Sequence, residues 1–257
     1  MPKAQGTALV TGSAIRLGKA ISQSLAQAGY NIALHYNSSQ EAALATADEF
    51  RSYGVECDLF PFDLLNEPDM NPLVERVRSR FGDLNVLVNS ASVYDAAPIA
   101  ETTLDLFEKQ FKVNFQAPYF LTQAFAKNNG SGCVINIIDN KVAFNQYQYS
   151  AYLLSKKALA EFTKLAAIEL APAIRVNGIA PGFILPVSTR TQDYVEWLID
   201  GIPVKQQGST ENIVKAVHYI LDNSFVAGQI LFVDGGESLT NVGRNAVTYE
   251  QITQIKQ

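Results

Sequence analysis

Seven short segments rich in apolar and β-branched residues alternate along this chain with longer segments of helical periodicity. Some of the short segments, such as ALV at 8–10, VLV at 86–88 and VINII at 134–138, are almost wholly apolar and lack a polar-apolar alternation. Strands covered on both faces have this pattern, which is typical of a parallel sheet. The chain is therefore predicted to form an α/β fold, a doubly wound parallel sheet of about seven strands with helices on both faces. The predicted strands are Thr7–Thr11, Asn31–Tyr36, Cys57–Pro61, Asn85–Asn89, Cys133–Ile138, Ile174–Ile179 and Ile230–Val233.

The sequence between these strands has no internal repeat, low-complexity stretch or linker, so residues 1–257 are expected to form a single domain. Residues 183–208 interrupt the alternation. An insertion near the carboxyl ends of the strands is where such sheets cover a ligand, so we expect a substrate-covering loop there, with Trp197 touching substrate. Residues 241–257 form a C-terminal tail without an assigned role. The predicted helices are Leu17–Gln27, Ser39–Tyr53, Glu67–Phe81, Thr103–Lys127, Tyr149–Leu170 and Thr210–Asp222.

The composition and charge of the chain argue against several classes of protein. The formal net charge is −5, which argues against a nucleic-acid partner bound through bulk charge. No run approaches the roughly 18 apolar residues of a membrane span, and the first residues lack a signal-peptide pattern, so a cytoplasmic protein is expected. Two cysteines and two histidines lie far apart and form no metal-binding pattern, so no metal is expected.

A glycine turn joins the first predicted strand to the first helix. Gly12 and Gly18 frame the segment Thr-Gly-Ser-Ala-Ile-Arg-Leu-Gly. A turn in this position presents backbone N–H groups and a helix N-terminus to a phosphate. The spacing is one residue too long for a Walker A loop, and Ala20 replaces the Ser or Thr of that motif.

This turn resembles the TGxxxGxG fingerprint of the short-chain dehydrogenase/reductase family, which has a Rossmann-type sheet. Arg16 replaces the middle glycine, as in the pteridine reductase branch of the family. A guanidinium suits a 2′-phosphate, and the second strand ends in Leu-His-Tyr-Asn-Ser-Ser without the acidic residue that binds an NAD ribose. The resemblance therefore implies NADP(H), with contacts from Gly12, Arg16, Leu17, Gly18, His35, Tyr36, Asn37, Ser39, Asp63, Leu64, Asn89, Ala91, Ser92, Tyr152, Lys156, Pro181, Gly182 and Ile184.

Tyr152 and Lys156 lie four residues apart in a predicted helix and so share one face. A nearby cation is expected to lower the pKa of the tyrosine and improve it as a proton donor. With Asp139 thirteen residues upstream, the arrangement resembles the Ser-Tyr-Lys group of the family. Aspartate replaces serine in the pteridine reductases too. Asn114 matches the fourth catalytic residue of the family.

The resemblance, over roughly Thr7–Thr240, implies NADPH-dependent reduction of a pteridine such as dihydrobiopterin or dihydromonapterin. Ser92, Tyr94, Asp139, Tyr152 and Trp197 would contact the substrate. The resemblance also implies a homotetramer. One alternative is a 3-oxoacyl-carrier-protein or other carbonyl reductase, which Asp139 disfavours because an ionised carboxylate repels a developing oxyanion. Another is a non-catalytic dinucleotide-binding regulator, which the intact Tyr152, Lys156 and Asn114 argue against.

Overall fold

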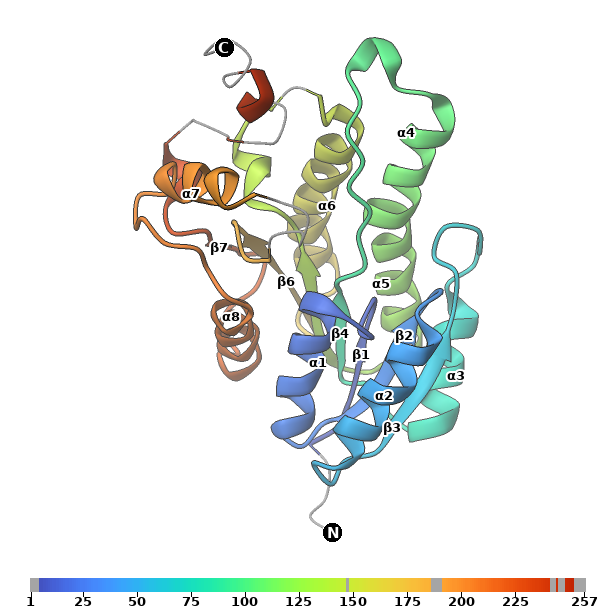
Figure 1. The fold of residues 1–257 in the computed structure, drawn as a ribbon. Helices are drawn as coiled ribbons and strands as arrows, with labels where there is room; N and C mark the ends of the chain where they lie inside the picture. Colours follow the sequence, from blue (N-terminus) through green and yellow to red (C-terminus); the bar gives the residue numbers. More distant parts are fainter. Residues whose placement is uncertain (1–4, 147, 186–190, 241–243, 245–247, 252–257) are drawn as a thin grey trace.

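A seven-stranded parallel sheet in the order β3-β2-β1-β4-β5-β6-β7 forms the centre of the molecule (Figure 1). A computed structural model describes residues 5–146, 148–185, 191–240, 244 and 248–251. The strands are β1 (Thr7–Val10), β2 (Asn31–Tyr36), β3 (Cys57–Pro61), β4 (Val86–Asn89), β5 (Gly132–Ile137), β6 (Ile174–Pro181) and β7 (Ile230–Val233). The strand order reverses between β1 and β4, and doubly wound sheets bind ligands at such a reversal.

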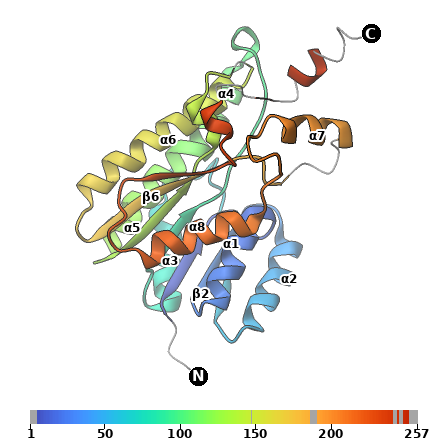
Figure 2. The same cartoon turned by 90° about the vertical axis from the view of Figure 1, so that its left-hand side faces the viewer.

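Helices cover both faces of the sheet (Figure 2). They are α1 (Arg16–Gln27), α2 (Gln40–Arg51), α3 (Asn71–Phe81), α4 (Leu104–Phe111), α5 (Ala117–Asn128), α6 (Ser150–Glu169), α7 (Gln192–Asp200) and α8 (Thr210–Asp222). Ala8 and Val10 of β1 pack in a cluster with α1, α2 and α8, whereas Leu9 packs with α3, α5 and α6. All four residues of β1 are fully buried, which explains why this strand lacks polar alternation.

The predicted sheet and the strand positions are confirmed, with bounds within two residues. The single helix expected over Thr103–Lys127 is wrong, because the π turn η2 (Lys112–Gln116) separates α4 from α5. Pro118 follows this turn and has no N–H group for an α-helical hydrogen bond to Asn114. The break therefore places buried Asn114 inside an irregular turn, a feature often found at functional sites.

The segment expected as a loop over 183–208 contains helix α7, which the sequence analysis missed. The Oγ1 of Thr191 caps this helix by accepting a hydrogen bond from the Tyr194 N–H at 3.4 Å. Residues 186–190 of the expected loop lie outside the described residues, as does most of the tail after Thr240. Among the described residues, no helix combines the length and apolar character needed to cross a membrane.

Candidate active site

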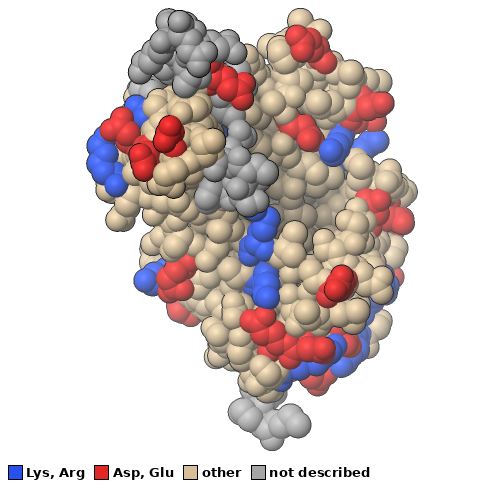
Figure 3. Space-filling view, viewed as in Figure 1, with Lys and Arg blue, Asp and Glu red and all other residues tan. Residues whose placement is uncertain are grey.

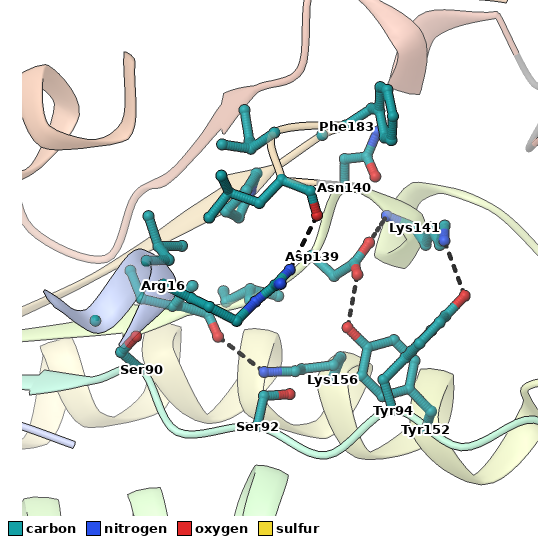
Figure 4. A pocket seen from close by; sticks show the side chains of 18 of the residues that line it. Arg16, Ser90, Ser92, Tyr94, Asp139, Asn140, Lys141, Tyr152, Lys156 and Phe183 are labelled. Carbon is teal, nitrogen blue, oxygen red and sulfur yellow. Dashed lines mark hydrogen bonds between the residues drawn. The ribbon is translucent and has the colours of Figure 1, made fainter. Parts of the chain in front are cut away.

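A pocket of about 590 Å³ opens at the carboxyl ends of β1, β4, β5 and β6 (Figure 4). The glycine turn and α1 line one side, residues 137–141 and α6 another, and residues 181–185 and α7 a third. Its size is within the range of small-molecule sites. Figure 3 shows basic side chains beside the hollow at the centre of this face.

The buried side chain of His35 stabilises the glycine turn. Gly12 has a φ of +66°, and its N–H donates to Nδ1 of His35 at 3.0 Å. The other ring nitrogen lies 3.1 Å from the carbonyl oxygen of Phe62, so Nε2 carries the proton. Burial lowers the pKa of His35 to about 4, which keeps the ring neutral. His35 is predicted to contact the cofactor, and in this structure its buried ring holds the turn through the Gly12 N–H.

The second glycine of the turn allows a close backbone approach. A side chain at Gly18 would overlap the carbonyl oxygen of Gly12. Thr11 links this turn to the next strand, because its Oγ1 accepts the N–H groups of Ser90 and Ala91, both at 2.9 Å. Thr11 therefore ties the turn to the end of β4, and both segments line the pocket beside the N-terminus of α1, where an anionic group fits.

Arg16 begins α1 with a φ of +53° and reaches across the pocket mouth. Its Nη2 donates to the carbonyl oxygen of Leu185 at 3.0 Å (Figure 4). The guanidinium is exposed and has further N–H donors, so it remains accessible to an anion. Arg16 thus lies at the pocket as predicted, and its link to the segment after β6 could not be seen in the sequence.

Tyr152 and Asp139 meet in the middle of the pocket. The hydroxyl of Tyr152 donates to Oδ2 of Asp139 at 2.6 Å, while Oδ1 accepts the N–H of Lys141 at 2.8 Å. Burial and the Asp139 carboxylate raise the pKa of Tyr152 well above its usual value. The expectation that a neighbouring cation lowers the pKa of Tyr152 is therefore wrong for this structure.

Lys156 lies on the same helix and lines the same pocket. Its Nζ donates to the carbonyl oxygen of Ile137 at 3.0 Å (Figure 4). Burial lowers the pKa of Lys156 to about 8, and the charge of Asp139 opposes this effect. Lys156 is thus a buried cation that is hydrogen-bonded to the end of β5, close to the Tyr152–Asp139 pair.

Asn114 does not line the pocket, although it was expected among the catalytic residues. It is fully buried. Its Oδ1 accepts from Oγ of Ser92 and from the N–H of Val93, both at 2.9 Å, and its Nδ2 donates to the Val93 carbonyl at 2.9 Å. The π turn therefore positions the segment that carries Ser92 into the pocket.

Tyr94 closes one wall of the pocket. Its ring stacks on Tyr149 with a centroid separation of 4.6 Å and meets the Tyr152 ring edge-on at 4.6 Å. Nζ of Lys141 donates to the Tyr94 hydroxyl at 3.1 Å. The aromatic side chain expected at this position therefore lines the pocket and packs against Tyr152.

Several residues expected at the site lie outside the pocket lining. Trp197 packs on Arg244 and Tyr249, while Tyr194 and Leu198 of the same helix line the pocket. Asn89 is buried behind the strand end and donates to Asn136. The remaining expected residues outside the lining are Tyr36, Asn37, Ser39, Asp63 and Leu64. Those that line it are Gly12, Arg16, Leu17, Gly18, Ala91, Ser92, Tyr94, Asp139, Tyr152, Lys156, Pro181, Gly182 and Ile184.

The pocket lining also contains charged and polar residues that were not predicted, among them Asn140, Lys141, Glu237 and Arg244. The first two directly follow Asp139 and could have been found from that position. Arg244 comes from the tail and gave no sequence signal. Among the described residues, no group of three or more His, Cys, Asp or Glu side chains is placed to hold a metal ion.

Comparisons with known proteins agree with this geometry. A family model described as enoyl-(acyl carrier protein) reductase matches residues 12–238. The uncharacterized oxidoreductase YohF of Escherichia coli K12 is 32% identical, over 91% of this chain and 96% of its own. A 3-oxoacyl-[acyl-carrier-protein] reductase FabG of Staphylococcus epidermidis is 28% identical, over 90% of this chain and 98% of its own.

Among solved structures, the FolM alternative dihydrofolate reductase 1 of Brucella suis, in complex with NADP, superimposes with a TM-score of 0.87. It is 32% identical, and the match covers 95% of this chain and 98% of that one.

Proposed function

Because this chain belongs to the short-chain dehydrogenase/reductase family, we propose that it is an NADPH-dependent reductase of a pteridine, such as dihydrobiopterin or dihydromonapterin. The observation that carries the proposal is the 2.6 Å hydrogen bond from the Tyr152 hydroxyl to Asp139. The solved NADP complex of a relative described as an alternative dihydrofolate reductase supports the same substrate class.

The Tyr152–Asp139 pair favours an imine over a ketone as the group reduced. A phenol that donates to a carboxylate holds its proton firmly, as the raised pKa of Tyr152 indicates. An oxyanion developing on a ketone would lie beside the Asp139 charge and be destabilised by it. A pteridine ring nitrogen is more basic than a ketone oxygen, so it takes a proton from a weaker acid. We assign delivery of that proton to Tyr152, with Asp139 as its partner.

The residues at the pocket mouth fit NADPH. Gly12 and Gly18 let the turn pack closely against Ala91 and against itself, a conformation suited to a pyrophosphate, and neutral His35 holds the turn in that conformation. The exposed Arg16 guanidinium is suited to the 2′-phosphate that distinguishes NADPH from NADH. When bound, NADPH supplies the hydride. Lys156 then holds a positive charge beside Tyr152 as the proton leaves.

A 3-oxoacyl-carrier-protein reductase is the second candidate. The family model's description and the FabG relative favour it. Asp139 argues against it, because its charge would destabilise an oxyanion that develops on the ketone. A non-catalytic dinucleotide-binding role is disfavoured because Tyr152 and Lys156 are both present and buried in the pocket wall.

The test compares NADPH oxidation with a dihydropterin, dihydrofolate and acetoacetyl thioester side by side. We expect a dihydropterin to be the best substrate. Asp139→Ser should lower kcat on it by about 10²–10⁴-fold, the usual contribution of a positioned acid-base group, with NADPH affinity unchanged. The same variant should keep or gain weak ketone reduction.

Asp48→Asn is the matched control, since this carboxylate is exposed on α2 and pairs with Arg51. It should behave as the wild type. A preference of the wild type for the thioester, or full pterin activity in Asp139→Ser, would refute the pteridine assignment while leaving the family assignment intact.

A further inference from the structure

Glu237 is a buried carboxylate in the pocket wall that the proton transfer described above does not use. It begins the short helical turn η4 (Glu237–Leu239) after β7, and 7% of its surface is exposed. Its Oε2 accepts a hydrogen bond from Nδ2 of Asn140 at 2.8 Å. Its Oε1 accepts none from the part of the chain that the structure describes. One oxygen of a carboxylate that is more than nine-tenths buried therefore lacks a protein donor.

The position of Glu237 relative to the reacting groups follows from Asn140. This residue comes directly after Asp139, and its amide also lies 3.4 Å from Oδ2 of Asp234. The turn η3 (Asn140–Ala143) packs against η4, so Asp139 and Glu237 border the same part of the pocket. Burial raises the pKa of Glu237, whereas the Asn140 hydrogen bond and the charge of Lys141 oppose that effect.

The oxygen of Glu237 that lacks a protein donor is accessible from the pocket, so a ligand that brings N–H groups can bond to it there. An N–C–N unit with two parallel N–H donors matches a carboxylate in the way a guanidinium does. A pterin carries such a unit in its 2-amino group and N3–H. The acyl chain of a thioester has no donor to offer, and it would leave Oε1 of Glu237 without a hydrogen bond.

We propose that Glu237 determines substrate specificity by accepting hydrogen bonds from the 2-amino and N3–H donors of the substrate's pyrimidine ring. Asn140 is its positioning residue. This inference rests on the proposed function, because it assumes that the ring reduced beside Tyr152 is fused to that pyrimidine. A site built for such donors rejects ligands that lack them, so Glu237 would select against ketoacyl substrates as well as for pterins.

The variant Glu237→Gln tests this role at nearly constant shape. Asn140 Nδ2 is a donor and would retain the amide oxygen of the new side chain. The NH₂ group would then face the substrate's own N–H donors, so attraction becomes repulsion. Glu211→Gln is the matched control, because Glu211 is an exposed carboxylate on α8 that lies 3.8 Å from Nζ of Lys215.

Binding is measured by calorimetry on the NADP⁺-loaded enzyme with two small probes. The first, 2-aminopyrimidin-4-one, is the donor-bearing half of a pterin, and the second, 2-methylpyrimidin-4-one, lacks the amino donors. Wild type and Glu211→Gln should prefer the amino probe by about 10–150-fold, the range for hydrogen bonds to a charged group. Glu237→Gln should lose that preference, with NADP⁺ affinity unchanged. On a dihydropterin it should raise KM with little change in kcat.

Two results would overturn the inference. One is a wild-type enzyme that binds the two probes equally well, a result that does not depend on whether any variant folds. The other is a Glu237→Gln enzyme that keeps the preference or weakens both probes equally, as a purely structural role predicts. Failure of the proposed function has a different signature. An enzyme that does not reduce pterins, yet loses its amino-probe preference with Glu237→Gln, would retain this site and need another substrate.

Discussion

Acid should destabilise this protein through His35, and the size of the effect follows from the lowered pKa of its buried ring. Nδ1 must stay unprotonated to accept the Gly12 N–H, and burial holds the pKa of His35 at about 4 instead of 6.5. Between these pH values the unfolded chain binds the proton and the folded chain does not, so stability falls as pH falls. Each pH unit in this range lowers the free energy of unfolding by about 1.36 kcal/mol, so the loss is roughly 2–3 kcal/mol by pH 4.5.

The comparison variant is His35→Asn, whose side-chain oxygen can still accept from Gly12 but cannot titrate. At pH 7.5 it should be less stable than the wild type by about 1–3 kcal/mol, because the Phe62 carbonyl loses its donor. At pH 4.5 this gap should close or reverse.

Urea unfolding of both proteins at the two pH values measures the effect, and NADPH affinity should fall with pH in the wild type as the turn loosens. His218→Asn, on the half-buried face of α8, controls for removing a histidine. Parallel pH profiles for the wild type and His35→Asn would show that His35 does not carry the acid sensitivity.

Three further predictions concern charge and assembly. Lys156→Met should abolish activity yet raise Tm at pH 7. The buried charge that it removes lowers the free energy of unfolding by roughly 3 kcal/mol, because the pKa of Lys156 is about 8 instead of 10.5. The gain in Tm should shrink as pH rises from 8 to 10.5, and a lower Tm at pH 7 would contradict the prediction. Arg16→Ala should weaken NADPH by about 10–150-fold in a fluorescence titration and leave NADH nearly unchanged, whereas equal losses would refute the 2′-phosphate role. Light scattering should give the mass of a homotetramer for the wild type. The double variant Leu165→Glu with Ile168→Glu should dissociate it, since these apolar α6 side chains are 62% and 78% exposed. A monomeric wild type would contradict this assembly.

The sheet could be predicted from the sequence because its central strands are covered by helices on both faces. β1 and β5 consist almost wholly of buried residues, and burial on both faces produces an apolar run that needs no knowledge of the tertiary structure. Helix α7 escaped prediction for the opposite reason. It is nine residues long, and Trp197 on it packs against Arg244 and Tyr249 of the distant tail, so its stability comes from tertiary contacts.

The catalytic group could be predicted as a set of positions but not as a set of bonds. Spacing placed Asp139, Tyr152 and Lys156 at one strand end. It could not show that Tyr152 donates to Asp139 or that Lys156 donates to Ile137, because these partnerships depend on side-chain directions at 2.6–3.0 Å. The same limit applies to His35, whose place in the motif suggested a ligand contact although its ring faces the protein interior.

A shifted pKa alone does not identify the site, as the two cysteines demonstrate. Burial raises the pKa of Cys57 to about 12 and that of Cys133 to about 11, yet both lie at the amino ends of their strands, away from the pocket lining. A buried thiol is neutral at pH 7 and behaves as a small apolar side chain. Tyr152, Lys156 and Glu237 differ because they line one pocket and retain hydrogen-bonding groups. Apolar side chains there would be more stable, so the polar groups indicate selection for chemistry at the carboxyl edge of the sheet.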